Sequence, residues 1–139
     1  MKNLFFSKDR LLKISPLRGL YIIFGVAFFV ITELGRNVYR PYIYMNQIND
    51  FGFADVIGNL FGTITIIFFQ LCIANATKKQ AIYITGFVTL GIAIYELLQL
   101  ILPRGTMDWK DVTATLIAGV LSLVLLALIR MLLKDPTTN

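Results

Sequence analysis

The sequence predicts an all-α integral membrane protein, a bundle of four transmembrane helices arranged as two parallel helical-hairpin repeats. Of its 139 residues, 57% are apolar and only 15% are charged, against roughly 25% charged residues in soluble domains. The charges fall mainly between four long apolar runs, and a helix of about 20 apolar residues is needed to cross membrane hydrocarbon. Short connections between such runs favour antiparallel neighbours and therefore a compact bundle.

The N-terminal segment, residues 1–18, carries five basic residues among leucine, phenylalanine and isoleucine. This pattern predicts a basic amphipathic segment on the anionic cytoplasmic face of a membrane, and a partly disordered basic tail is the alternative interpretation. The first span follows over residues 19–39, with Glu33 and Arg36 in its last third. We expect its helix to stop before Pro41, because proline interrupts the hydrogen bonding of a helix interior.

Three further apolar runs complete the predicted bundle. The second covers residues 54–76 and is uncharged after Asp55, the third covers residues 80–102 with the single charge of Glu96, and the fourth covers residues 112–129 with none. Pro103 follows the third run and predicts the end of its helix. The transmembrane domain is therefore predicted over residues 19–133, and residues 134–139 form a short cytoplasmic tail.

The charged residues divide unequally between the two sides of this bundle. The side with both termini holds nine of the 13 basic residues, and the other side holds Arg36, Arg40, Arg104 and Lys110. Because basic residues are enriched in cytoplasmic loops, both termini are predicted to be cytoplasmic. Most acidic residues lie toward the opposite, outer side, namely Glu33, Asp50, Asp55, Glu96, Asp108 and Asp111.

The two halves of the chain repeat one pattern of ionisable residues. Each half has a glutamate near the end of its first span, a polar residue three positions later, and a proline next to an arginine. Its second span then opens with Asp-Val, at Asp55 in the first half and Asp111 in the second. A two-helix unit returns the chain to its starting side, so the repeats are predicted to be parallel, related by an axis along the membrane normal.

In these residues the chain resembles the VanZ-like family of small bacterial membrane proteins, whose pattern is E-x-x-Q, a following Arg, and D-x-x-x-N-x-x-G-x-x-x-G on the next helix. The second half matches through Glu96, Gln99, Arg104 and Asp111, with Thr115 in place of the asparagine, and the first half matches through Glu33, Asp55, Asn59 and Gly62. The resemblance implies a multi-pass protein of the bacterial cytoplasmic membrane, related to glycopeptide antibiotic resistance and the cell envelope.

The polar cluster has three functional interpretations. The first is a pocket that binds an extracytoplasmic lipid or cell-wall precursor head group, since arginine suits phosphate while acids and amides suit sugar or amine groups. The second is an ion-pair scaffold of a small interaction or assembly protein, in which Arg40 and Arg104 pair with Glu33 and Glu96. The third is a proton- or ion-coupled transporter with Glu96 as the carrier group. The candidate ligand-binding residues are Glu33, Arg36, Arg40, Asp55, Asn59, Glu96, Gln99, Arg104, Asp111 and Thr115.

Other residues restrict the function classes. Histidine is absent and Cys72 is the single cysteine, so no triad, internal disulfide or cysteine metal cluster is expected, and we expect no cofactor, metal or nucleic-acid partner. The carboxylates can pair as acid and base, but no nucleophile motif or phosphate loop accompanies them, which favours binding over catalysis. Membrane lipids are expected partners, and the oligomeric state is left open. Small and polar residues predicted to mediate close helix packing are Gly58, Gly62, Ala118 and Ser122.

Overall fold

The structure is a computed structural model that describes residues 15–102 and 107–133. Its elements are α2 (Pro16–Leu34), the π-helical turn η1 (Gly35–Tyr39), α3 (Arg40–Met45), α4 (Phe53–Ile73), α5 (Lys78–Leu98) and α6 (Trp109–Leu132). Within this part of the chain there is no strand, and four helical runs are long and apolar enough to cross a membrane. The predicted fold class is thereby confirmed. The predictions for residues 1–14, for Arg104 and for the tail concern residues that lie outside these described ranges.

Polar residues define where three of the helices begin. The Ser15 hydroxyl accepts a hydrogen bond from the backbone N–H of Arg18 at 3.2 Å, directly before Pro16 opens α2. Thr77 and Gln80 form a reciprocal capping box at the start of α5. Asp108 accepts from the N–H of Lys110 at 2.9 Å and caps α6. Each side chain satisfies N–H groups that have no partner within the helix.

The predicted stop at Pro41 is wrong, because the first helical run continues to Met45. The chain passes through the π-helical turn η1, where the N–H of Arg40 bonds to the carbonyl of Gly35 five positions back. Pro41 follows this turn as the second residue of α3, and it has no N–H to donate to the preceding turn. The wider turn before the proline gives its ring room that a regular helix interior lacks. The connection between this helical run and α4 is therefore shorter than predicted and covers only residues 46–52.

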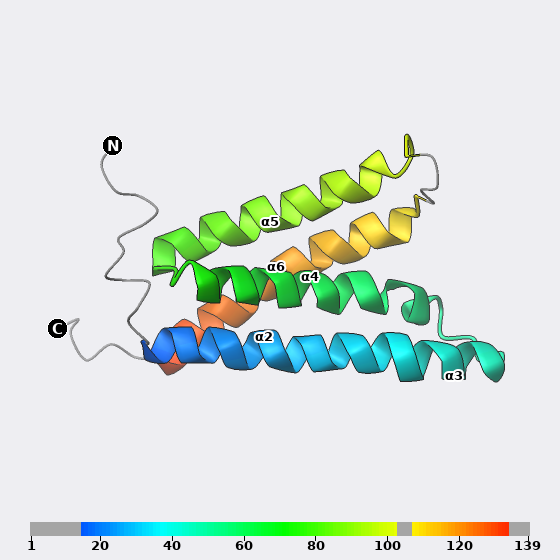
Figure 1. Cartoon of the computed structure of the whole chain (residues 1–139), viewed down its shortest axis with the longest axis horizontal. Helices are drawn as coiled ribbons and strands as arrows, with labels where there is room; N and C mark the ends of the chain where they lie inside the picture. Colours follow the sequence, from blue (N-terminus) through cyan, green and yellow to red (C-terminus); the bar gives the residue numbers. More distant parts are fainter. Residues whose placement is uncertain (1–14, 103–106, 134–139) are drawn as a thin grey trace.

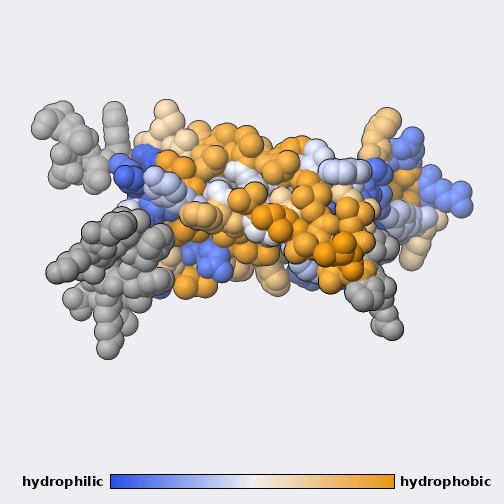
Figure 2. Space-filling view, turned by 90° about the horizontal axis from the view of Figure 1, so that it is seen from above, coloured by the Kyte–Doolittle hydropathy of each residue, from blue (hydrophilic) through white to orange (hydrophobic). Residues whose placement is uncertain are grey.

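The helices form two hairpins, α2 with α4 and α5 with α6, whose inner helices α4 and α6 pack on each other. This arrangement agrees with two related hairpins, although α4 also packs against α5. As Figure 1 shows, α6 crosses the bundle obliquely, so that its start lies by the end of α5 and its end lies by the start of α2. The surface is mainly apolar between more hydrophilic ends (Figure 2), as expected of a multi-pass membrane protein.

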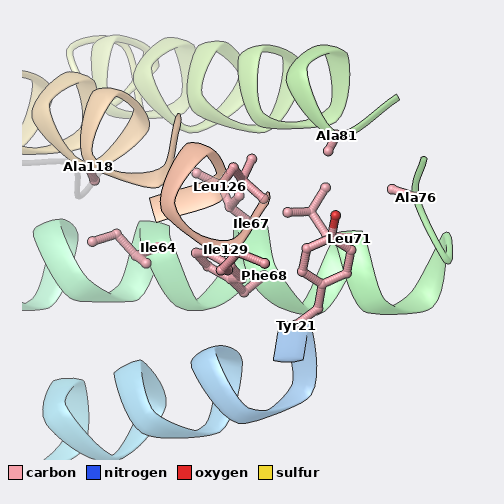
Figure 3. Close-up of a cluster of buried hydrophobic side chains, with 10 residues drawn as sticks. All are labelled: Tyr21, Ile64, Ile67, Phe68, Leu71, Ala76, Ala81, Ala118, Leu126 and Ile129. Atoms are coloured by element: carbon pink, nitrogen blue, oxygen red, sulfur yellow. The ribbon is translucent and has the colours of Figure 1, made fainter. Parts of the chain in front are cut away.

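The apolar core lies at the end of the bundle where α2 starts and α6 ends. Tyr21, Phe68, Leu71, Leu126 and Ile129 are almost completely buried there (Figure 3). The rings of Phe24 and Phe68 stack at 5.4 Å, and those of Phe28 and Phe61 stack at 5.9 Å, which joins α2 to α4. This end of the bundle is therefore tightly closed by side chains.

Glycines allow close approach at three helix contacts. A Cβ atom added to Gly35 would lie 2.5 Å from the Ile57 side chain, and one added to Gly119 would lie 2.5 Å from Oγ1 of Thr89. The equivalent atom on Gly25 would lie 2.9 Å from the Phe69 ring. Small residues at such contacts are the usual means by which membrane helices pack closely.

Candidate functional site

A polar pocket of about 590 Å³ lies at the end of the bundle opposite the apolar core. It is enclosed by η1 and α3, by the first two turns of α4, and by the start of α6. This volume is within the range of small-molecule sites, about 300–1,000 Å³. The lining residues, hereafter the polar pocket, are Arg36, Arg40, Ala54, Asp55, Ile57, Gly58, Asn59, Met107, Asp108 and Asp111.

One wall of the polar pocket is basic and comes from η1 and α3. Nη2 of Arg40 lies 3.7 Å from Oδ1 of Asp55, and its guanidinium lies 5.5 Å from the centre of the Tyr44 ring. The Tyr44 hydroxyl in turn donates a hydrogen bond to Asp55 and accepts one from Nε of Arg40. Arg40 is therefore held in place by an aromatic ring and a carboxylate, while Arg36 contributes the second positive charge.

The facing wall is acidic and comes from the starts of α4 and α6. Asp55 and Asp111 both lie in first helical turns, where the helix dipole favours a negative charge. Nζ of Lys110 lies 3.9 Å from Oδ2 of Asp55, so this carboxylate is near two cations. The side chain of Asn59 lies beside the carboxylate of Asp111 and lines the same cavity. The polar pocket thus presents fixed positive and negative groups to one cavity.

Asp50 fixes the loop behind the acidic wall. Its carboxylate accepts hydrogen bonds from the N–H groups of Gly52 at 3.0 Å and Ala54 at 2.6 Å, and from the Tyr39 hydroxyl at 3.2 Å. Desolvation opposes the charged form, but these hydrogen bonds outweigh it and lower the pKa of Asp50. Sequence reasoning counted Asp50 only as an outer acid. The sequence feature that indicates this role is the position of Asp50 shortly before Gly52 and the start of α4.

The predicted site residues do not all share this cavity. Arg36, Arg40, Asp55, Asn59 and Asp111 line it. Glu33 does not, and its carboxylate accepts a hydrogen bond from Asn37 at 2.9 Å. The expected pairing of Arg40 with Glu33 is wrong, because Arg40 reaches Asp55 instead. Because the first helical run continues through η1 into α3, Arg40 lies next to Asp55 at the start of α4.

Glu96 and its neighbours lie behind the polar pocket, between α5 and α6. Glu96 is only 6% exposed, accepts a hydrogen bond from Gln99, and lies close enough to Asp111 for their charges to interact. Thr115 is completely buried. Glu96 is thus more deeply buried than its counterpart Glu33, which is half-buried, so the two halves are similar in arrangement but differ at their glutamates.

The predicted packing residues lie at two different helix contacts. Gly58 faces the side chain of Arg36, and Gly62 faces Thr32, so both glycines lie on the α2–α4 side. Ala118 and Ser122 are completely buried in α6. Small residues therefore lie at helix contacts in both hairpins, where their size allows the helices to pack closely.

Comparison with known protein families, with curated proteins and with solved structures finds no match for this chain. The fold and the site therefore define its class directly, as a small multi-pass membrane protein with a charged pocket at one end of a four-helix bundle. Among the described residues no group of acidic or cysteine side chains could hold a metal ion.

Proposed function

We propose that the polar pocket binds the head group of a lipid or a cell-wall precursor at the outer face of the bacterial cytoplasmic membrane. The observation that carries this proposal is the placement of Arg36 and Arg40 opposite Asp55 and Asp111 around one cavity of about 590 Å³. The proposal also adopts the cytoplasmic termini predicted from the basic residues and the resemblance to VanZ-like proteins of glycopeptide resistance. In this orientation the pocket opens where such head groups are found.

The charges of the polar pocket indicate the chemistry of its ligand. A guanidinium group recognises phosphate through paired N–H donors, which assigns a phosphate to the Arg36 and Arg40 wall. The carboxylates of Asp55 and Asp111 accept hydrogen bonds from amines and hydroxyls. A head group that carries a phosphate together with an amine or sugar therefore fits both walls. The apolar surface of the helices offers contact to its acyl chains.

Thermal unfolding in detergent tests this proposal. Short-chain phosphatidylethanolamine, a phosphate- and amine-bearing lipid, should raise the Tm of the unsubstituted protein more than an uncharged detergent of the same chain length does. Arg36→Gln should abolish this increase while leaving the fold intact. Lys79→Gln is the matched control, because it removes one exposed positive charge at the opposite end of the bundle. Equal stabilisation of both variants by the lipid would contradict the proposal.

A second candidate function, an ion-pair scaffold, is favoured by one observation. Asp55 lies within 4 Å of two cationic side chains, at 3.7 Å from Arg40 and 3.9 Å from Lys110, and so connects the ends of three helices. In that case Asp55→Asn should lower the Tm substantially without any added lipid, and lipid should stabilise the Arg36→Gln variant normally. The two functions are thus distinguished by the same set of measurements.

A further inference from the structure

A second cavity, an open groove of about 560 Å³, lies between the starts of α4 and α6. It shares no lining residue with the polar pocket, although the same two helices contribute to both. Most of its lining side chains are apolar or aromatic, unlike those of the polar pocket. The walls of this groove, hereafter the apolar groove, include Phe51, Phe53, Val56, Trp109, Lys110 and Ile117.

The polarity of the apolar groove changes along its length. Its upper end lies at the first turn of α6, where Trp109 and Lys110 line it. Its lower end is lined by Val56 and Ile117, and Ile117 lies roughly 12 Å further along α6 at 1.5 Å per residue. Tryptophan and lysine are typical of the membrane interface. The groove therefore runs from the interface into the hydrocarbon, in the order in which a phospholipid carries its phosphate and its acyl chain.

The loop before α4 holds an aromatic ring at the upper end of the apolar groove. Phe51 has a φ of 57°, a left-handed conformation that is unfavourable for a bulky side chain. The loop maintains it, because the N–H of Phe51 donates to Asn49 at 3.0 Å and the N–H of Gly52 donates to Asp50 at 3.0 Å. The Phe51 side chain is nevertheless 94% exposed. A strained backbone that presents an apolar ring to the surroundings indicates a binding role.

Lys110 gives the upper end of the apolar groove a positive charge. Its ammonium group lies over Gly52, 3.1 Å from where a Cβ atom would be. Its distance to Asp55 is 3.9 Å, which is longer than a hydrogen bond, and Asp55 also lies near Arg40. The carboxylate of Asp50, which lines the same groove, already accepts three hydrogen bonds. The ammonium of Lys110 therefore retains N–H donors for an anionic group, and lysine is a common ligand of phosphate.

We propose that the apolar groove binds one phospholipid of the surrounding bilayer, with its phosphate at Lys110 and one acyl chain along Val56 and Ile117. The groove contacts this chain from both helices, whereas a lipid elsewhere on the surface touches one convex face. The groove lipid should therefore exchange more slowly with the bilayer than other lipids do. This inference does not depend on ligand binding in the polar pocket, and it holds for either orientation of the protein in the membrane.

Tryptophan fluorescence tests the proposal directly, because Trp109 is the single tryptophan of the chain and lines the groove. Phosphatidylglycerol with brominated acyl chains, added to the protein in detergent, should quench this fluorescence to a plateau at a low mole fraction of lipid. Lys110→Gln, or brominated diacylglycerol without a phosphate, should raise the half-maximal mole fraction several-fold. Arg36→Gln removes a positive charge from the polar pocket and should leave it unchanged. Quenching without a plateau, or an equal effect of Lys110→Gln and Arg36→Gln, would overturn the proposal.

Filling the groove provides an independent measurement. Thr113 is an exposed lining residue of the groove, so Thr113→Phe should occupy the space of the acyl chain and raise the half-maximal mole fraction several-fold. Val120→Phe is the matched control, since Val120 is 62% exposed on the same helix but lies outside the groove. Equal quenching curves for the two variants would overturn the proposal. Absence of quenching together with a dimer in analytical ultracentrifugation would also overturn it, because a second copy of the chain would then cover the groove.

Discussion

The guanidinium of Arg40 lies 3.7 Å from the carboxylate of Asp55 and so joins the end of the first helical run to the start of α4. Both side chains remain partly open to solvent, with exposures of 47% and 37%. Ion pairs of this kind are screened and contribute little to stability. The contact therefore orients two charges of the polar pocket more than it holds the helices together.

The first prediction concerns the energy of this pair. A double-mutant cycle with Arg40→Gln and Asp55→Asn should give a coupling free energy of only about 0.2–1 kcal/mol, because the pair is partly exposed. Chemical or thermal unfolding in detergent measures it. A coupling several times larger would support the scaffold function over the binding function. Lys78→Gln, at the far end of the bundle, controls for loss of one positive charge.

The second prediction concerns the closest contact between α5 and α6. Gly119→Ala should lower the free energy of unfolding by about 1–3 kcal/mol, the usual effect of overpacking, because its new Cβ would lie 2.5 Å from Oγ1 of Thr89. Adding Thr89→Ala should recover part of this loss. Gly86→Ala is the control, since no atom lies within 4 Å of its Cβ position. It should be neutral or stabilising, because alanine is the better helix former.

The positions of the four helical runs were predictable because membrane crossing demands long apolar segments. The observed helices α4, α5 and α6 overlap the predicted spans over most of their length. The continuation through Pro41 was not predictable from proline's usual effect. It depends on the π-helical turn and on tertiary contacts of this region, such as Tyr39 with Asp50 and Arg40 with Asp55.

The candidate site was predictable only in part. Helical spacing placed Arg36, Asp55 and Asp111 near one end of the bundle, and the structure brings them to one pocket. Which polar residues share the cavity depends on how α6 crosses α4, and the sequence carries no direct signal for this angle.

The third prediction uses the lowered pKa of Asp50. A carboxylate whose pKa is lower in the folded state stabilises the protein above its unfolded pKa, and this stabilisation is lost as the pH falls through the folded value. Asp50→Asn should therefore lower the Tm at pH 7. The difference between the two proteins should begin to shrink as the pH falls below the ordinary aspartate pKa of about 3.9, and it should be lost once the pH passes the lowered pKa of folded Asp50. Unfolding curves at several pH values measure this difference, and a constant difference would contradict the assigned role.

The fourth prediction is the topology, with both termini in the cytoplasm. In intact cells carrying a Cys72→Ala background, a membrane-impermeant thiol reagent should label Gln47→Cys, in the exposed connection before α4. Lys78→Cys, at the exposed start of α5, should be labelled only after the cells are permeabilised. Labelling of Lys78→Cys from outside would reverse the orientation and place the polar pocket on the cytoplasmic side.

The last prediction concerns the buried carboxyl group of Glu96. Its exposure is 6%, Gln99 donates a hydrogen bond to it, and the neighbouring charge of Asp111 is of the same sign. Glu96→Gln keeps the shape and the hydrogen-bonding capacity of the side chain but removes its negative charge. Thermal stability in detergent should therefore be unchanged or raised, because a buried charge near a like charge is unfavourable.

Glu96→Ala is the matched comparison for this variant. It removes the acceptor of the Gln99 hydrogen bond and leaves a void between α5 and α6, so unfolding should become easier by about 1–3 kcal/mol. If Glu96→Gln destabilises the protein as much as Glu96→Ala does, the charge of Glu96 must be paired with a cation. That outcome would favour the scaffold function. Proteoliposomes add a separate measurement, since loss of a pH-driven ion flux in the Glu96→Gln variant alone would identify Glu96 as a carrier group of a transporter.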